Sequence, residues 1–292
     1  MLKLMTPAHW EEYELIDFGR FEKLERFGRT ILIRPEPQAV GDSILSESEW
    51  HKKADFRFEQ KNSSTGTWIP LKKNVPDRWK ITYKSPSLQL QFRLGMTAFK
   101  HVGLFPEQAV NWEYIAERGK QAKGMKILNL FAYTGGASLA GAACGAEVTH
   151  VDSVKQVITW ANENREISQL RDIRWIVEDA LKFVQREERR GNKYHGIILD
   201  PPAYGIGANG ERWKLEEKIN ELIASLSKLL EKKNSFLIFN AYSMGFSPLI
   251  PEALIQTHFK DFNLSHLECG ELYFPDQFGR KLPMGVFARF HT

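Results

Sequence analysis

Asn129-Leu130-Phe131-Ala132-Tyr133-Thr134-Gly135-Gly136-Ala137-Ser138 is an apolar segment that runs into two glycines and then into small residues. The apolar part predicts a buried strand over 127–131, and the small residues predict a helix over 136–144. Glycines at such a turn let the backbone approach a ligand, and the N-terminus of the following helix can receive a carboxylate. The segment therefore predicts the first strand–turn–helix unit of an α/β sheet, with a ligand at its turn.

Strands and helices continue to alternate toward the end of the chain. Further strands are predicted over 147–151, 174–177, 194–199 and 235–240, and helices over 154–161, 181–190, 215–230 and 249–262. This alternation indicates a parallel, doubly wound sheet. The last two predicted strands, 264–273 and 284–290, have no helix between them and must form an antiparallel edge hairpin. We therefore expect an α/β fold with a Rossmann-like, mostly parallel sheet whose last strand is antiparallel.

Acidic residues follow the second and third predicted strands. Asp152 lies 17 residues beyond Gly135, where a carboxylate can accept both hydroxyls of a ribose, and Asp179 is placed to meet an adenine edge. Carboxyl ends of parallel strands share one edge, so these residues predict a single nucleoside-binding rim. Nicotinamide dinucleotides and S-adenosylmethionine (SAM) both carry a ribose. The turn lacks Gly-x-Gly-x-x-Gly, which disfavours a pyrophosphate and favours SAM.

The fourth predicted strand ends at Asp200-Pro201-Pro202-Ala203-Tyr204. The two prolines restrict φ and remove two backbone donors, so the carbonyls here cannot be consumed in a sheet ladder. The segment predicts a rigid corner that presents a carboxylate, free carbonyls and an aromatic ring at the ligand-binding edge of the sheet. Such a corner suits a planar, nitrogen-bearing substrate, with its amine facing oxygen acceptors and its ring stacked.

Residues 1–95 predict a β-rich domain ahead of the alternating domain 96–292. Period-two alternation over 79–84 and 88–93 predicts a hairpin there. Residues 50–93 contain ten Lys and Arg against three Asp and Glu, a net charge of +7, and are interleaved with aromatic residues: Trp50, Phe56, Phe58, Trp68, Trp79 and Tyr83. This pattern is typical of surfaces that contact phosphates and bases. The alternative is a small antiparallel sheet with a solvated basic face and a core built from these rings.

The composition is that of an ordinary globular protein, with 42% hydrophobic and 26% charged residues among 292. No apolar run is long enough to cross a membrane, and acidic residues from Glu11 onward argue against a signal peptide. Cys144 and Cys269 lie far apart, and no His or Cys spacing indicates a metal site. We therefore expect a cytoplasmic protein with no metal and no membrane partner, as a monomer or a homodimer.

Taken together, the motifs Asn129–Ser138, Asp152 and Asp200–Tyr204 resemble the class I SAM-dependent methyltransferases. Within that class the chain is similar to the bacterial branch that contains the 23S rRNA large-subunit methyltransferases. The segments that carry this closer likeness are 100–108 with Asn111-Trp112, 210–213 and 279–283. The resemblance covers residues 95–292, and the RNA-binding PUA module fused to some members is not evident.

The resemblance implies SAM as cofactor and RNA, ribosomal RNA above all, as partner. In this chain the implied cofactor-binding residues are Phe105, Gln108, Asn129, Phe131, Ala132, Tyr133, Thr134, Gly135, Asp152, Ser153, Asp179, Ala180 and Asp200. The implied catalytic residues are Asp200 and Pro201, which orient the acceptor nitrogen, and Tyr204, which stacks on a base.

Methyl transfer is an in-line displacement, so alignment and exclusion of water should dominate catalysis. Members that methylate cytosine C5 need a thiolate near the end of the fifth strand, and residues 239–244, Phe-Asn-Ala-Tyr-Ser-Met, contain no cysteine. We therefore expect a base nitrogen as acceptor, with oxygen as the alternative. The competing functions are a small-molecule or protein methyltransferase and a SAM-binding protein without catalysis.

Overall fold

The computed structural model of the chain describes residues 1–8, 10–62, 65–121, 124–207, 210–242 and 245–292. The chain folds into two compact units. The α/β unit comprises Met1–Met5, Gln108–Leu272 and Gly285–Thr292, and the β unit comprises Thr6–Glu107 and Tyr273–Met284. Both units combine distant parts of the chain, whereas the domains predicted above, 1–95 and 96–292, are continuous. How the chain divides into independently folding domains stays a prediction.

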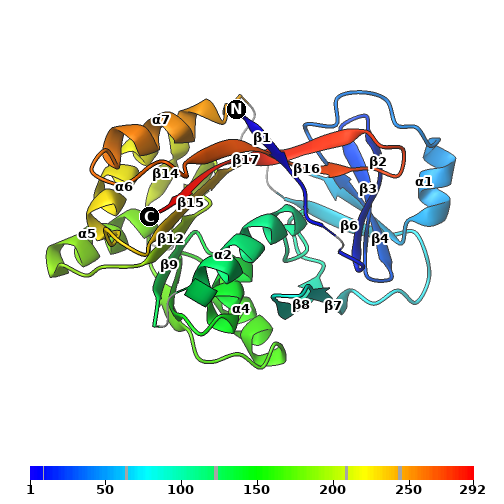
Figure 1. The fold of residues 1–292 in the computed structure, drawn as a ribbon. Helices are drawn as coiled ribbons and strands as arrows, with labels where there is room; N and C mark the ends of the chain where they lie inside the picture. The colour runs from blue at the N-terminus through cyan, green and yellow to red at the C-terminus, as the bar shows by residue number, and fades with distance from the viewer. Residues whose placement is uncertain (9, 63–64, 122–123, 208–209, 243–244) are drawn as a thin grey trace. The chain divides into compact units, whose positions relative to one another are not determined.

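The α/β unit is built on an eight-stranded sheet with the strand order β1-β16-β17-β15-β12-β9-β10-β11 (Figure 1). Its strands are β1 (Lys3–Met5), β9 (Lys126–Leu130), β10 (Glu147–Asp152), β11 (Arg174–Val177), β12 (Gly196–Leu199), β15 (Phe236–Ala241), β16 (Glu268–Pro275) and β17 (Lys281–His291). Strands β9, β10, β11, β12 and β15 pair in parallel, and β17 is antiparallel to β15. The predicted fold class, a mostly parallel sheet with an antiparallel last strand, is confirmed.

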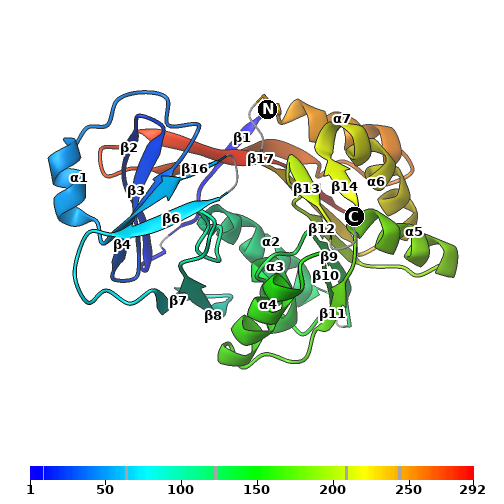
Figure 2. The same cartoon turned by 180° about the vertical axis from the view of Figure 1, so that it is seen from behind.

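Helices cover both faces of this sheet (Figures 1 and 2). On one face lie α2 (Ala109–Gln121), α3 (Gly136–Ala143) and α4 (Lys155–Ile167), and on the other lie α5 (Ala180–Arg190), α6 (Leu215–Leu229) and α7 (Leu249–His258). Leu128 and Leu130 of β9 share a buried cluster with Leu222 and Leu226 of α6. Because side chains alternate along a strand, the intervening Asn129 faces the opposite layer, toward α3. This alternation determines which residues can build the site.

Several elements of the structure were not predicted individually, among them β1, a short hairpin and a short helix. Strand β1 pairs in parallel with β16 and has only three residues, too few to show a periodic pattern. The short hairpin of β13 (Tyr204–Ile206) and β14 (Arg212–Lys214) follows the Asp200 corner. Helix α1 (Glu47–Lys53) buries only Trp50, but Ser46 and Glu49 form a capping box at its start. That capping box was visible in the sequence as Ser-x-x-Glu.

The β unit contains a five-stranded sheet with the order β2-β3-β4-β5-β6, and a separate hairpin, β7-β8. Its strands are β2 (Tyr13–Gly19), β3 (Glu22–Phe27), β4 (Thr30–Pro35), β5 (Phe56–Gln60), β6 (Gly66–Pro70), β7 (Arg78–Lys84) and β8 (Gln89–Gly95). The predicted hairpin over 79–84 and 88–93 is therefore confirmed. Four of the six aromatic residues in the basic segment are buried: Trp50, Phe56, Phe58 and Tyr83. Those four rings build the core and are not available to stack on bases.

Among the described residues, no helix combines the length and the apolar character needed to cross a membrane.

Candidate active site

The predicted site residues of the α/β unit gather at the carboxyl ends of β9, β10, β11 and β12. Parallel pairing brings the strand ends together, since Asp152 at the end of β10 lies opposite Val177 at the end of β11. The strand order reverses between β9 and β12, and ligands of doubly wound sheets bind at such a switch point. Phe105 belongs to the β unit, where its ring lies 4.9 Å from that of His101.

The turn after β9 has an unusual backbone. Phe131 and Tyr133 have positive φ angles of 53° and 48°, and Gly135 has φ 92°. Non-glycine residues adopt this conformation at a cost of order 1–3 kcal/mol, and such positions cluster at ligand sites. A Cβ on Gly136 would come within 2.6 Å of the Trp112 ring, so this glycine allows α3 to pack closely against α2. The surrounding structure therefore holds Phe131 and Tyr133 in a backbone conformation that is unfavourable for residues with a side chain.

Helix α3 begins directly at this turn with its N-terminus open. Its N-cap is Gly135, which offers no side chain to cap the first backbone N–H groups. Those N–H groups and the positive end of the helix dipole suit a carboxylate such as that of SAM. The first strand–turn–helix unit thus offers backbone N–H groups that could bind the carboxylate of SAM.

Asp152 lies on the rim and also forms a hydrogen bond with the backbone of the turn. Its Oδ2 accepts a hydrogen bond from the Tyr133 backbone N–H at 3.0 Å, and its Oδ1 accepts one from Val154 N–H at 2.9 Å. Burial raises the pKa of this carboxyl despite these bonds. Each carboxylate oxygen has a second lone pair, so Asp152 can still accept ribose hydroxyls. The sequence suggested the ribose role but not the contact with the turn.

Asn129 and Thr134 lie beneath the rim. The Asn129 amide donates to Ser138 Oγ at 2.9 Å, and that hydroxyl lies 3.0 Å from His150 Nδ1. The Thr134 carbonyl accepts from Asn164 Nδ2 at 3.0 Å. Asn129 and Thr134 are both buried, as is Ala132. Their contribution to a ligand therefore comes through the backbone or through support of the turn.

Asp179 lies at the third strand end and caps helix α5. Its Oδ1 accepts from the Lys182 backbone N–H at 2.9 Å. Asp179 is half-buried, and the adjacent Ala180 is buried as the first residue of the helix. Ser153, half-buried beside Asp152, completes the rim. The second oxygen of Asp179 is the atom that can meet an adenine amine.

The Asp200 corner differs in part from its prediction. The Pro202 carbonyl accepts a hydrogen bond from Trp213 Nε1 at 2.7 Å, and the Ala203 carbonyl accepts one from Leu215 N–H at 3.0 Å. Two of the carbonyls that were expected to be free are thus occupied, because the β13–β14 hairpin folds back onto the corner. Among the described residues none donates to the Pro201 carbonyl. The Tyr204 ring is 57% exposed and open to stacking.

The Asp200 carboxylate has little support. Gln108 Nε2 donates to its Oδ2 at 3.3 Å, and burial raises the pKa of Asp200 to about 7. Such a carboxyl can hold or release a proton near neutral pH, as general acid–base groups do.

Gln108 is itself held by residues that the sequence did not single out. Asn111 Nδ2 donates to Gln108 Oε1 and to Asn240 Oδ1, both at 3.0 Å. Arg289 in turn donates to Asn111 Oδ1 at 3.0 Å and to Glu268 at 2.5 Å. The Asn240 amide nitrogen is buried without a partner in the described part of the chain. A polar chain of side chains thus reaches the Asp200 carboxylate from α2, β15 and β17.

Other reactive groups do not reach this corner in a reactive form. Burial raises the pKa of both thiols, Cys144 and Cys269, so neither is a ready nucleophile. Cys144 ends helix α3 and Cys269 lies in β16. Ser243 and Met244 of the fifth-strand segment lie outside the described residues. Within the described ranges no group of three or more His, Cys, Asp or Glu side chains could hold a metal.

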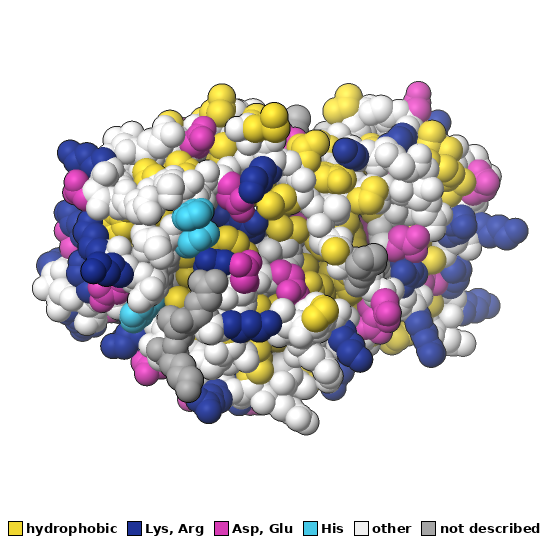
Figure 3. All heavy atoms as spheres, viewed as in Figure 1, with side chains coloured by type: hydrophobic (Ala, Val, Ile, Leu, Met, Phe, Trp, Pro, Cys, Tyr) yellow, Lys and Arg dark blue, Asp and Glu magenta, His cyan; other side chains and the backbone are white. Residues whose placement is uncertain are grey.

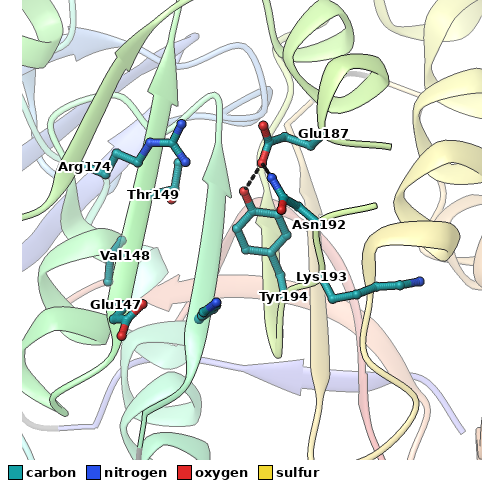
Figure 4. A pocket seen from close by; sticks show the side chains of 9 residues that line it. Glu147, Val148, Thr149, Arg174, Glu187, Asn192, Lys193 and Tyr194 are labelled. Atoms are coloured by element: carbon teal, nitrogen blue, oxygen red, sulfur yellow. Dashed lines mark hydrogen bonds between the residues drawn. The ribbon is translucent and has the colours of Figure 1, made fainter. Parts of the chain in front are cut away.

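A pocket of about 230 Å³ lies at the opposite, amino edge of the sheet (Figure 4). It is lined by Thr149, Arg174, Glu187 and Tyr194, among others. None of the predicted site residues lines it.

Comparison with known proteins identifies the family. A profile of the S-adenosylmethionine-dependent methyltransferases matches residues 51–253. Proteins named "Ribosomal RNA large subunit methyltransferase K/L" from Shewanella frigidimarina and Shewanella loihica are 33% and 26% identical over 195 and 211 residues. These matches cover 65% and 70% of this chain but 26% and 27% of the relatives. The chain thus spans about a quarter of their length.

One solved structure matches almost the whole chain. The crystal structure of a SAM-dependent methyltransferase from Agrobacterium tumefaciens superposes with a TM-score of 0.89 at 36% identity, covering 99% of this chain and 93% of that one. The turn after β9, the open N-terminus of α3 and the acidic rim have features that suit SAM. The chain therefore belongs to the S-adenosylmethionine-dependent methyltransferase family, with SAM as its cofactor.

Proposed function

We propose that this enzyme methylates a nitrogen atom of a base in ribosomal RNA. The observation that carries the proposal is the Asp200 corner, whose carboxyl has its pKa raised by burial to about 7 and lies at the strand end beside the cofactor rim. The names of the Shewanella relatives support an rRNA substrate. Such a substrate places the enzyme in the cytoplasm.

When bound, SAM supplies a methyl group on a positively charged sulfur. Asp200 Oδ and the Pro201 carbonyl would accept hydrogen bonds from the acceptor N–H groups and so aim the nitrogen lone pair. Tyr204 would stack on the base, which limits its tilt. Asp200, ionised in part near neutral pH, takes the proton that the nitrogen loses and passes it to solvent.

A nitrogen acceptor is favoured over C5 of a pyrimidine because covalent addition to the ring needs a thiolate. The thiols of Cys144 and Cys269 have raised pKa values and lie away from Asp200 in the chain's topology. A base within a helix cannot reach the corner while it is stacked, so the target nucleotide must be unpaired or flipped.

The decisive experiment incubates the enzyme with tritiated-methyl SAM and, in parallel, with ribosomal subunits, deproteinised rRNA and a protein extract. We expect label in RNA, and mass analysis of nucleosides should place it on a ring or exocyclic nitrogen. Asp200→Ala should retain SAM binding and lose transfer. Label confined to protein or small molecules, label on C5, or undiminished transfer by Asp200→Ala would contradict the proposal.

A further inference from the structure

The hairpin of β7 and β8 carries positive charge on its outward face. Arg78, Lys80 and Lys84 alternate along β7 and are exposed, while the residues between them point inward. In the antiparallel register Lys80 lies directly opposite Arg93 of β8. Like charges placed opposite each other across a sheet are unfavourable. The face therefore carries an arrangement that folding alone does not favour.

The inner face of the same hairpin is firmly anchored within the β unit. Ile81, Leu90, Phe92 and Leu94 are fully buried. Trp79 Nε1 donates to the Phe27 carbonyl at 3.1 Å, and Trp10 Nε1 donates to the Thr82 carbonyl at 3.0 Å. Glu12, the acidic residue that reaches β7 from the neighbouring segment, accepts from the Thr82 backbone N–H. The cations thus stand on a rigid support, which lowers the entropy cost of binding through them.

Two other cations of the basic segment form ion pairs inside the β unit. Arg57 pairs with Glu22 at 2.9 Å, and Lys72 pairs with Asp55 at 3.0 Å. In contrast, no acidic side chain of the described residues pairs with Arg78, Lys80 or Lys84. Arg78, Lys80 and Lys84 therefore form a row of exposed cations on the outward face of the hairpin, with no acidic partner among the described residues.

On the α/β unit, some surface lysines form ion pairs with glutamates. Lys182 pairs with Glu211 and Lys228 pairs with Glu188, both at 2.6 Å. Figure 3 shows both signs of charge interleaved over the side of the molecule where α5 lies in Figure 1. A face with one sign of charge thus differs from this part of the surface.

We propose that the outward face of β7–β8 binds the phosphate backbone of the RNA substrate. This inference rests on the proposed function insofar as RNA is the substrate. Alternate residues of a strand are about 6.6 Å apart, which suits successive phosphates of an extended strand. Thr82, Gln89 and Gln91, which complete the face, offer hydrogen bonds to sugars and phosphates. The face exposes no large apolar side chain that could insert into a membrane.

The test is the triple variant Arg78→Gln, Lys80→Gln, Lys84→Gln, compared with the wild type for binding fluorescent rRNA fragments at several salt concentrations. Loss of three phosphate contacts should reduce the slope of log affinity against log salt by about 2 and weaken binding at low salt roughly tenfold. KM for RNA should rise while kcat and SAM affinity stay near wild type. Tm should not fall, because the substitution removes repulsion and no partner.

The matched control, Arg171→Gln, Lys233→Gln, Lys260→Gln, removes the same charges from exposed positions of the α/β unit. If both triple variants lose affinity equally, or if the hairpin variant binds as the wild type does, the inference is overturned while rRNA methylation stands. If the wild type labels no RNA, the proposed function fails. Salt-dependent RNA binding through the hairpin would then still support the phosphate-binding face. Preference for anionic vesicles over RNA would overturn it.

Discussion

The pKa of a carboxylate is shifted in opposite directions at the two edges of the central sheet. At the carboxyl edge, burial raises the pKa of Asp200 to about 7, and Gln108 is the one donor that reaches it among the described residues. At the amino edge, burial alone would raise the pKa of Glu187. Hydrogen bonds from Tyr194 at 2.8 Å, Asn192 at 2.7 Å and Arg190 at 3.1 Å outweigh burial, and the pKa is lowered (Figure 4).

This difference separates a reactive carboxylate from a structural one. A fully supported carboxylate stabilises the fold and has no unmet demand for a ligand. A poorly supported one keeps its affinity for protons and for donors on a substrate. The pocket at the amino edge is lined by Glu187, yet this carboxylate already accepts hydrogen bonds from Tyr194 and Asn192. The candidate active site is therefore distinguished by a carboxylate with few hydrogen-bond donors, and not by the presence of a pocket.

Asp200→Asn is expected to have the largest effect on the reactive carboxylate. We expect the methyl-transfer rate to fall by about 10²–10⁴, because the side chain can no longer accept a proton while its size is kept. SAM affinity, measured by calorimetry, should stay near wild type. Transfer at the wild-type rate would show that the raised pKa is incidental.

Asp152→Asn tests the second carboxylate of that edge. The dissociation constant for SAM should rise roughly 10- to 100-fold, since charged hydrogen bonds to a ribose contribute about 1.5–3 kcal/mol. Asp152→Ala also frees the Tyr133 N–H, so it should cost more affinity than the Asn variant. Equal losses in the two variants would mean that the contact with the turn contributes nothing to SAM affinity.

The pH dependence of the methyl-transfer rate is expected to show a smaller effect than these substitutions. Transfer should fall about tenfold from pH 8 to pH 6, as the carboxyl with a pKa of about 7 becomes protonated. The folded state holds this proton to higher pH than the unfolded state, so Asp200 lowers stability as pH rises from about 4 to 7. Asp200→Asn should therefore raise Tm more at pH 8 than at pH 5. A flat rate profile would argue against Asp200 as proton acceptor.

Glu187→Gln should have no effect on transfer or on SAM affinity. It should lower the free energy of unfolding by about 1–3 kcal/mol, because an amide cannot accept from all three donors. The pKa of Glu187 is lowered in the folded state, so this advantage of the wild type is present at neutral pH and disappears in acid. Glu147→Gln, an exposed residue of the same pocket, should leave stability unchanged. Loss of methyl transfer in Glu187→Gln would contradict a purely structural role for Glu187.

The sequence predicted those parts of the site that lie on regular alternation. Apolar strands followed by Gly135, Asp152 and Asp200 locate the rim, because strand ends of a parallel sheet must share one edge. The strained φ angles of Phe131 and Tyr133 left no signal in residue type. The contact of the Tyr133 N–H with Asp152 joins residues 19 positions apart, so it also left no local signal.

Support for Asp200 was beyond sequence reasoning. Asn111 and Arg289 are 178 positions apart and meet only because β17 inserts next to β15. Trp213 reaches the Pro202 carbonyl through a hairpin of two three-residue strands, too short to show alternation. The cationic face of β7 was present in the sequence as period two, but only the tertiary structure shows that no acidic side chain of the described residues pairs with it.

The three residues of β1 have a further consequence for handling the protein. They cover the outer side of β16, where a Cβ on Gly270 would come within 1.8 Å of the Lys3 carbonyl oxygen. Lys3 also forms an ion pair with Glu268. Removing Lys3–Met5 would bare the backbone N–H and C=O groups of β16, the kind of open edge on which chains associate. Tags and truncations that disturb these residues are therefore expected to promote aggregation.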